Sequence, residues 1–97
     1  MMKRQGDLLI IKVPGIPALA VQQQSKVLAE GEATGHFHKL DSGEVYEENG
    51  TLYFKVDDNT STALEHPEHA TVTFDPGVYK VIRQREYEPN GWRQVSD

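Results

Sequence analysis

The sequence contains no cysteine, and this absence removes several kinds of chemistry. Without cysteine there is no disulfide framework, no thiolate metal site and no cysteine nucleophile. None of the serines lies in a GxSxG turn, and the glycines form no phosphate-cradling loop. The remaining sources of reactive chemistry are therefore the histidines and the carboxylates.

Long apolar runs are also missing near the N-terminus. The run at residues 8–11 is four residues long and ends at Lys12. That is too short for the hydrophobic segment of a signal peptide or for a membrane span. We therefore expect no membrane partner and a cytoplasmic protein, in keeping with the lack of cysteine.

Basic residues are scarce in the middle of the chain. Residues 41–75 carry nine acids and one base, a net charge of −8, whereas the whole chain has −5. Such a segment repels a phosphate backbone and attracts cations. The stretch "QREYEPNGWR" offers an aromatic and basic surface for single-stranded nucleic acid, but Glu86 and Glu88 cancel much of its charge. We therefore expect no nucleic-acid partner.

Helical patterns are missing too, because Gly, Pro or Asn interrupts every candidate amphipathic window. Alternating segments bounded by turn residues predict an all-β protein, a single domain over residues 1–97. We expect an antiparallel barrel or sandwich of about 7–9 short strands. The strongest local signals are strands at 7–13, 25–33 and 78–88, an inward-pointing Val72 and Phe74, and hairpins at Asn49-Gly50 and Asn90-Gly91.

Three of these strands carry predictions about which side chains share a face. Residues 7–13 are predicted to be buried on both faces or nearly so, because the run is apolar and β-branched. In the segment 25–33, Val27 and Ala29 are predicted on one face and Leu28 on the other. After Asn49-Gly50, the returning strand is predicted to place Leu52, Phe54 and Val56 on one face and Tyr53 and Lys55 on the other.

All four histidines lie in two short motifs, HxH at His36 and His38 and HxxH at His66 and His69. On a strand, His36 and His38 leave the same face, and two imidazoles so placed can bind one metal ion. A turn at Pro67 would bring the second pair together, and His69 is the favoured third ligand because it immediately precedes a strand pattern. His66 is the reserve ligand. The alternative to a metal site is four histidines near strand ends, each hydrogen-bonded separately.

The carboxylates predicted to accompany these motifs are Glu44 and Glu68. They are candidate ligands and, if the protein is an enzyme, candidate catalytic bases acting beside a metal that polarises a small oxygenated substrate. The expected cofactor is a divalent transition metal, with zinc, iron, nickel and manganese left open.

The spacing of HxH, Glu44 and Gly50 resembles the first metal-binding motif of the cupins, which are small β-barrel proteins. The resemblance covers residues 31–77 and implies His36 and His38 as ligands, Glu44 as a looser one, and His69 as the third histidine by role. Each spacing differs from the family motif by about one residue. The second cupin motif is not matched, because Asp75-Pro76-Gly77 follows His69 instead of preceding it.

The whole chain also resembles short uncharacterised bacterial and phage proteins. The sequence therefore supports two functional hypotheses. The first is a metal-binding β domain that can act on a small molecule. The second is a non-catalytic interaction or structural protein that self-associates through edge strands.

Overall fold

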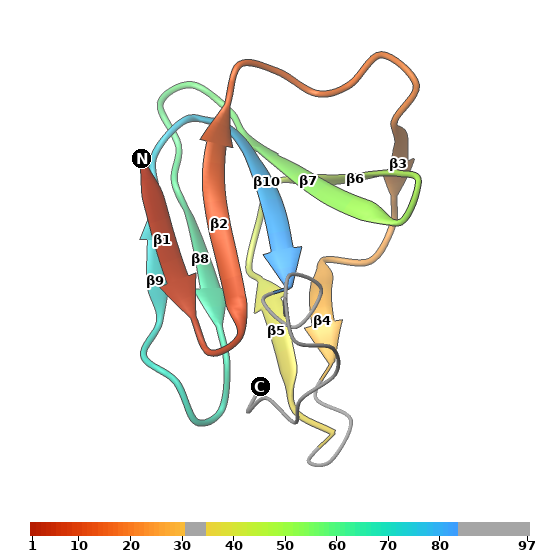
Figure 1. Cartoon of the computed structure of the whole chain (residues 1–97). Coiled ribbons are helices and arrows are strands. Elements are labelled where there is room, and N and C mark those ends of the chain that lie inside the picture. The colour runs from red at the N-terminus through yellow and green to blue at the C-terminus, as the bar shows by residue number, and fades with distance from the viewer. Residues whose placement is uncertain (31–34, 84–97) are drawn as a thin grey trace.

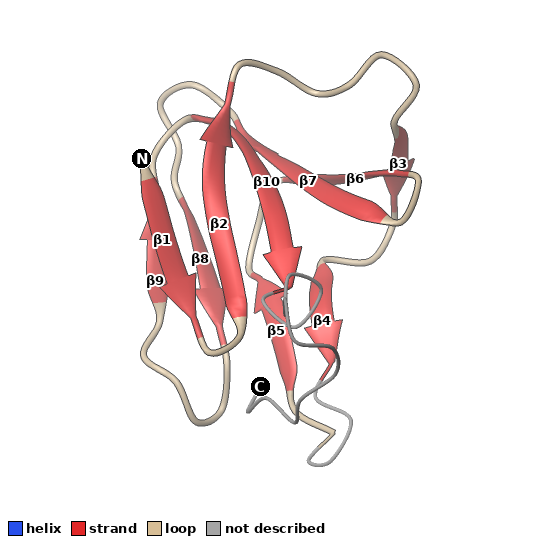
Figure 2. Cartoon of the chain, in the orientation of Figure 1, coloured by secondary structure: helices blue, strands red, loops and turns tan. Residues whose placement is uncertain are grey.

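The computed structural model describes residues 1–30 and 35–83, and these residues form an all-β fold (Figures 1 and 2). The prediction of an antiparallel β protein is confirmed. The described residues form ten strands, more than expected. They are β1 (Met2–Gln5), β2 (Leu8–Val13), β3 (Val21–Gln23), β4 (Val27–Glu30), β5 (Phe37–Leu40), β6 (Glu44–Glu48), β7 (Thr51–Val56), β8 (Thr62–Glu65), β9 (Val72–Phe74) and β10 (Gly77–Arg83).

The strands form two antiparallel sheets and not a closed barrel, so the sandwich is the correct alternative. The larger sheet has six strands in the order β1-β2-β10-β7-β6-β3, and the smaller has four in the order β4-β5-β8-β9. Among residues 1–30 and 35–83 there is no helix, and hence none long and apolar enough to cross a membrane.

The core lies between the two sheets and follows from the alternation of side chains along the strands. Leu8 and Ile10 of β2 and Phe54 and Val56 of β7 point inward, as the period of a half-buried strand requires. Phe74 of the smaller sheet packs against the rings of Phe54 and Tyr79 from the larger one, with centroids 5.2 and 5.1 Å away. This aromatic cluster joins the sheets.

The hairpin at Asn49-Gly50 is confirmed. Both residues have positive φ, 50° and 82°, and Glu48 pairs with Thr51 across the turn. Positive φ at both central residues is the requirement of a type I′ turn, which suits Asn and Gly.

Other strand predictions need correction. In strand β2, Leu8 and Ile10 are fully buried on one face, whereas Leu9 and Ile11 on the other face are only partly buried. In β4, Leu28 and Ala29 are both buried, because the pairing with β5 shifts register between Val27 and Ala29 and breaks the alternation. The end of the 78–88 strand and the Asn90-Gly91 hairpin lie outside the described residues.

The chain crosses between the sheets at a polar corner where β5 leads into β6. Asp41 Oδ1 accepts hydrogen bonds from the Ala63 N–H at 3.0 Å, the Thr62 hydroxyl at 3.0 Å and the Ser42 hydroxyl at 3.1 Å. These bonds hold the pKa of Asp41 below its ordinary value, with the Ala63 N–H contributing most. Gly43 follows at φ 95°. The corner therefore ties the end of β5 to the start of β8.

We expect Gly43→Ala to destabilise the protein by roughly 1–3 kcal/mol in denaturant unfolding. A Cβ at this position would lie 2.9 Å from the backbone oxygen of Lys55, and the positive φ adds strain. Gly15→Ala is the matched control, because its Cβ would meet nothing within 4 Å. Equal stabilities of the two variants would contradict the packing at the corner.

Asp41→Asn should lower the free energy of unfolding at pH 7 by roughly 1 kcal/mol, because the amide accepts these bonds less strongly than the carboxylate. A lowered folded-state pKa means that the carboxylate stabilises the protein above the unfolded pKa, and that this stability is lost as the pH falls below about 4. The difference between parent and variant should therefore shrink in acid. Asp58→Asn, at an exposed position, is the control. A difference that does not depend on pH would contradict the role of Asp41.

Candidate functional site

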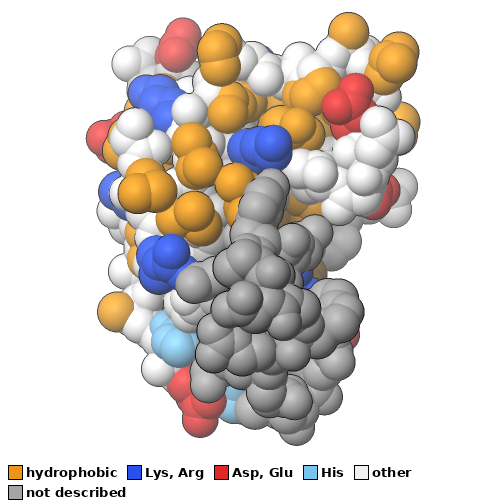
Figure 3. Space-filling view, viewed as in Figure 1, with side chains coloured by type: hydrophobic (Ala, Val, Ile, Leu, Met, Phe, Trp, Pro, Cys, Tyr) orange, Lys and Arg blue, Asp and Glu red, His pale blue; other side chains and the backbone are white. Residues whose placement is uncertain are grey.

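The four histidines meet at the end of the sandwich where β5 begins and β8 ends. His38 is in β5, His36 precedes that strand, and His66 and His69 lie in the loop after β8. Pairing of β5 with β8, Lys39 opposite Glu65, brings the two motifs together. Figure 3 shows histidine side chains reaching the surface at this end, beside an acidic side chain.

Three of the rings form a compact group. The ring centroids of His38 and His66 are 4.4 Å apart, those of His66 and His69 are 4.5 Å apart, and those of His38 and His69 are 6.0 Å apart. His36 joins this group through His66, at 5.6 Å. We call the rings of His38, His66 and His69 the histidine triad. The turn at Pro67 does bring the HxxH pair together.

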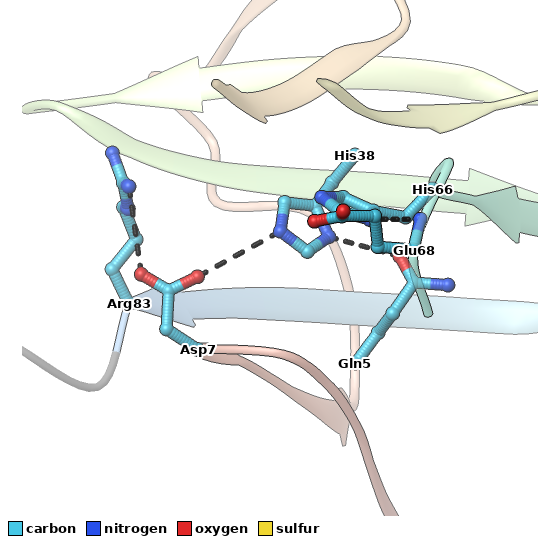
Figure 4. Close-up of polar contacts among 6 residues, drawn as sticks. All are labelled: Gln5, Asp7, His38, His66, Glu68 and Arg83. Atoms are coloured by element: carbon cyan, nitrogen blue, oxygen red, sulfur yellow. Dashed lines mark hydrogen bonds and ion pairs between the residues drawn. The ribbon is translucent and has the colours of Figure 1, made fainter. Parts of the chain in front are cut away.

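His38 is fully buried, and its protonation is fixed by Gln5 of β1 (Figure 4). The Gln5 Nε2 donates to the carbonyls of Leu64 and Ala70 at 2.8 and 2.9 Å, so its Oε1 is the acceptor that faces His38 Nδ1 at 2.9 Å. The Nδ1 of His38 must then carry a proton. In the neutral ring, Nε2 holds the lone pair.

A buried carboxylate lies on the other side of the His38 ring. Asp7, in the turn between β1 and β2, is 2% exposed, and its Oδ1 is 3.7 Å from His38 Nε2. Its other oxygen faces the Arg83 guanidinium at 3.5 Å. Because buried charges are normally paired, the Arg83 guanidinium accounts for the buried Asp7 carboxylate, and a proton or other cation at His38 Nε2 would give that carboxylate a second partner (Figure 4).

Contacts with the loop after β8 orient the rings of His66 and His36. His66 Nδ1 accepts the backbone N–H of Glu68 at 3.0 Å, so the neutral His66 ring carries its proton on Nε2. The Glu68 carboxylate lies 3.3 Å from His36 Nδ1, which favours a proton on that nitrogen. The neutral rings of His38 and His66 therefore have opposite tautomers.

The carboxylate predicted to accompany the HxH motif lies elsewhere. Glu44 is in β6 of the larger sheet, where it accepts a hydrogen bond from the Tyr46 hydroxyl at 2.8 Å. That bond raises the pKa of Tyr46, because the neutral hydroxyl is the donor. The expectation that His69 opens a strand is also wrong, since β9 begins at Val72.

Within residues 1–30 and 35–83, no group of three or more histidine and acidic side chains is arranged to hold a metal ion as it stands. The neutral His66 ring directs Nδ1 at a backbone N–H and carries a proton on Nε2, so neither nitrogen can bind a metal without a change of partner.

A family described as "Domain of unknown function (DUF8820)" matches residues 4–84. The chain belongs to this family. The match includes the four histidines together with Gln5, Asp7 and Arg83. No curated protein and no solved structure matches the chain.

Sequence reasoning missed Gln5, Asp7 and Arg83. The signal that was available is the polar turn Gln5-Gly6-Asp7, which interrupts an otherwise continuous strand pattern. Its position beside His38 depends on contacts between residues 33 positions apart, and no local pattern reveals these.

We expect Gln5→Leu to destabilise the protein by roughly 2–4 kcal/mol, because it leaves the buried Leu64 carbonyl, the partly buried Ala70 carbonyl and the Nδ1–H of His38 without their partner on Gln5. Gln24→Leu, at an exposed position, is the matched control and should change the free energy of unfolding by less than about 0.5 kcal/mol. Chemical denaturation of both variants measures the difference. Similar midpoints would show that the Gln5 amide does not hold the two sheets together.

Proposed function

We propose that this protein binds a divalent transition metal through the histidine triad. The observation that carries the proposal is the mutual spacing of the three rings, 4.4 to 6.0 Å between centroids. Two imidazoles bound to one tetrahedral Zn²⁺ at about 2.0–2.1 Å place their centroids about 5 Å apart. The centroid distances in the histidine triad lie on either side of this value.

The tautomer of His38 also supports metal binding. A histidine that ligates a metal through Nε2 usually donates its Nδ1–H to a protein acceptor, which orients the ring. Gln5 supplies that acceptor to His38 in a fully buried position. Asp7, 3.7 Å from His38 Nε2, adds negative charge that favours a cation at this nitrogen.

His66 is the residue that must change. For its ring to bind a metal through Nδ1, the Glu68 N–H has to be displaced from that nitrogen. The rearrangement is confined to the four-residue turn from His66 to His69. Metal binding is therefore coupled to the conformation of the loop between β8 and β9.

The ligand set differs from the HxH pair plus His69. His36 contacts the triad only through His66 among the described ring pairs, and Glu68 holds it from the other side. We place His36 at the rim of the site. If the ion acts on a substrate, Glu68 is the better candidate base, because Glu44 is engaged by Tyr46 in the larger sheet.

The test is calorimetric titration of untagged protein with Zn²⁺ and with Ni²⁺, together with metal analysis. We expect one ion per chain. Variant His69→Gln should weaken affinity at least about tenfold, the range seen when ligands or their partners are lost. His36→Gln is the matched control and should weaken affinity less than about threefold.

Two results would count against this site. Absence of stoichiometric metal in the parent would refute metal binding. A parent affinity that His69→Gln leaves unchanged would refute the histidine triad. Circular dichroism of each variant establishes that the fold is retained, which is expected because His69 and His36 are both partly exposed.

A further inference from the structure

One stretch of the chain has no charge at all. Residues 13–25 contain no Asp, Glu, Lys or Arg, in a protein in which 26% of residues are charged. Strand β3 lies in this stretch and ends the larger sheet. In Figure 1 it stands at the side of the molecule, beyond β6 and β7. Exposed edge strands normally carry charges that discourage pairing with another chain, and β3 lacks them.

The register of β3 leaves backbone groups on its outer side. Glu48 pairs with Thr51 at the hairpin, so alternate residues of β6 bond to β7 and the intervening ones face β3. Val21 lies opposite Glu47 and Gln23 opposite Val45. The N–H and C=O of Gln22 consequently point outward, and within the described residues no strand pairs with this edge.

Apolar side chains are concentrated at the same edge. Leu19 and Val21 are 81% and 64% exposed, and they are the most exposed large hydrophobic residues after residue 2 in the described part of the chain. With Gln23, they line one side of an open hollow of about 460 Å³, whose other side is formed by residues 47–50. An exposed apolar surface beside an uncharged edge indicates a protein contact.

The other three edges of the two sheets are protected. Strand β1 carries Lys3 and Arg4, and β4 ends at Glu30. Strand β9 lies against β1, where the Lys3 ammonium donates to the Thr73 carbonyl. These features leave β3 as the edge best suited to pairing.

We propose that β3 pairs with β3 of a second copy of this chain, antiparallel about a two-fold axis at Gln22. The partner is an identical copy because the chain has a net charge of −5, so two copies approach most easily where the surface strand carries no charge, and an uncharged edge does not repel itself. Gln22 of each copy then faces Gln22 of the other, and Val21 faces Gln23. The two larger sheets become one continuous sheet.

Sedimentation velocity of the full chain over roughly 10–500 μM tests this pairing. We expect a dimer in the parent and a monomer in both Val21→Lys and Gln22→Pro. The lysine places like charges across the axis, and the proline removes the outward N–H while leaving the bonds to β6 intact. Met2→Lys, at a position 65% exposed on β1, is the matched control and should remain a dimer.

Circular dichroism confirms that each variant keeps its strands, and Val21→Lys keeps the test decisive if proline disturbs the fold. A parent that is monomeric throughout this concentration range would overturn the proposal. So would a dimer that survives Val21→Lys, or an assembly that grows beyond two copies, which a two-fold contact cannot produce.

Discussion

The amide of Gln5 is the interaction on which the rest of the structure depends. It sits 3% exposed in the larger sheet and donates to two carbonyls at the end of the smaller one, Leu64 and Ala70. With both its N–H groups engaged, its oxygen dictates where the proton lies on His38. The Gln5 side chain therefore connects the two sheets and holds the loop between β8 and β9. It also determines which ring nitrogen of His38 carries the proton. Because each of these groups is costly to leave unsatisfied, the arrangement is strongly determined.

The molecule separates two kinds of surface. At one end, histidines are surrounded by carboxylates, Asp7 in the interior and Glu68 at the rim, which favour a cation. At the side, the β3 edge is free of charge and carries Leu19 and Val21. In the two proposals, charge attracts a small ion at the first surface, and the absence of charge permits close approach of another chain at the second. The two proposals therefore depend on different residues and can succeed or fail independently.

Local sequence patterns predict a large part of this structure. The Asn49-Gly50 turn, the buried face of β7 and the all-β class follow from turn chemistry and alternation. The two histidine motifs are predicted to meet, and they do. The place of Glu44 is not predictable in this way, because the chain leaves the smaller sheet after β5 and returns at β8, which puts β6 in the other layer. Gln5 and Asp7 are missed for the same reason, since their roles arise from pairings across the whole chain.

The central claim is that Gln5 fixes His38 as the Nδ1–H tautomer while Glu68 fixes His66 as the opposite one. Long-range proton–nitrogen NMR correlation of the histidine rings measures this directly, since protonated and unprotonated ring nitrogens resonate far apart. The structure requires a protonated Nδ1 in His38 and an unprotonated Nδ1 in His66 in the metal-free protein at a pH where both rings are neutral. An unprotonated Nδ1 in His38, or a mixture of tautomers exchanging at that ring, would contradict the account.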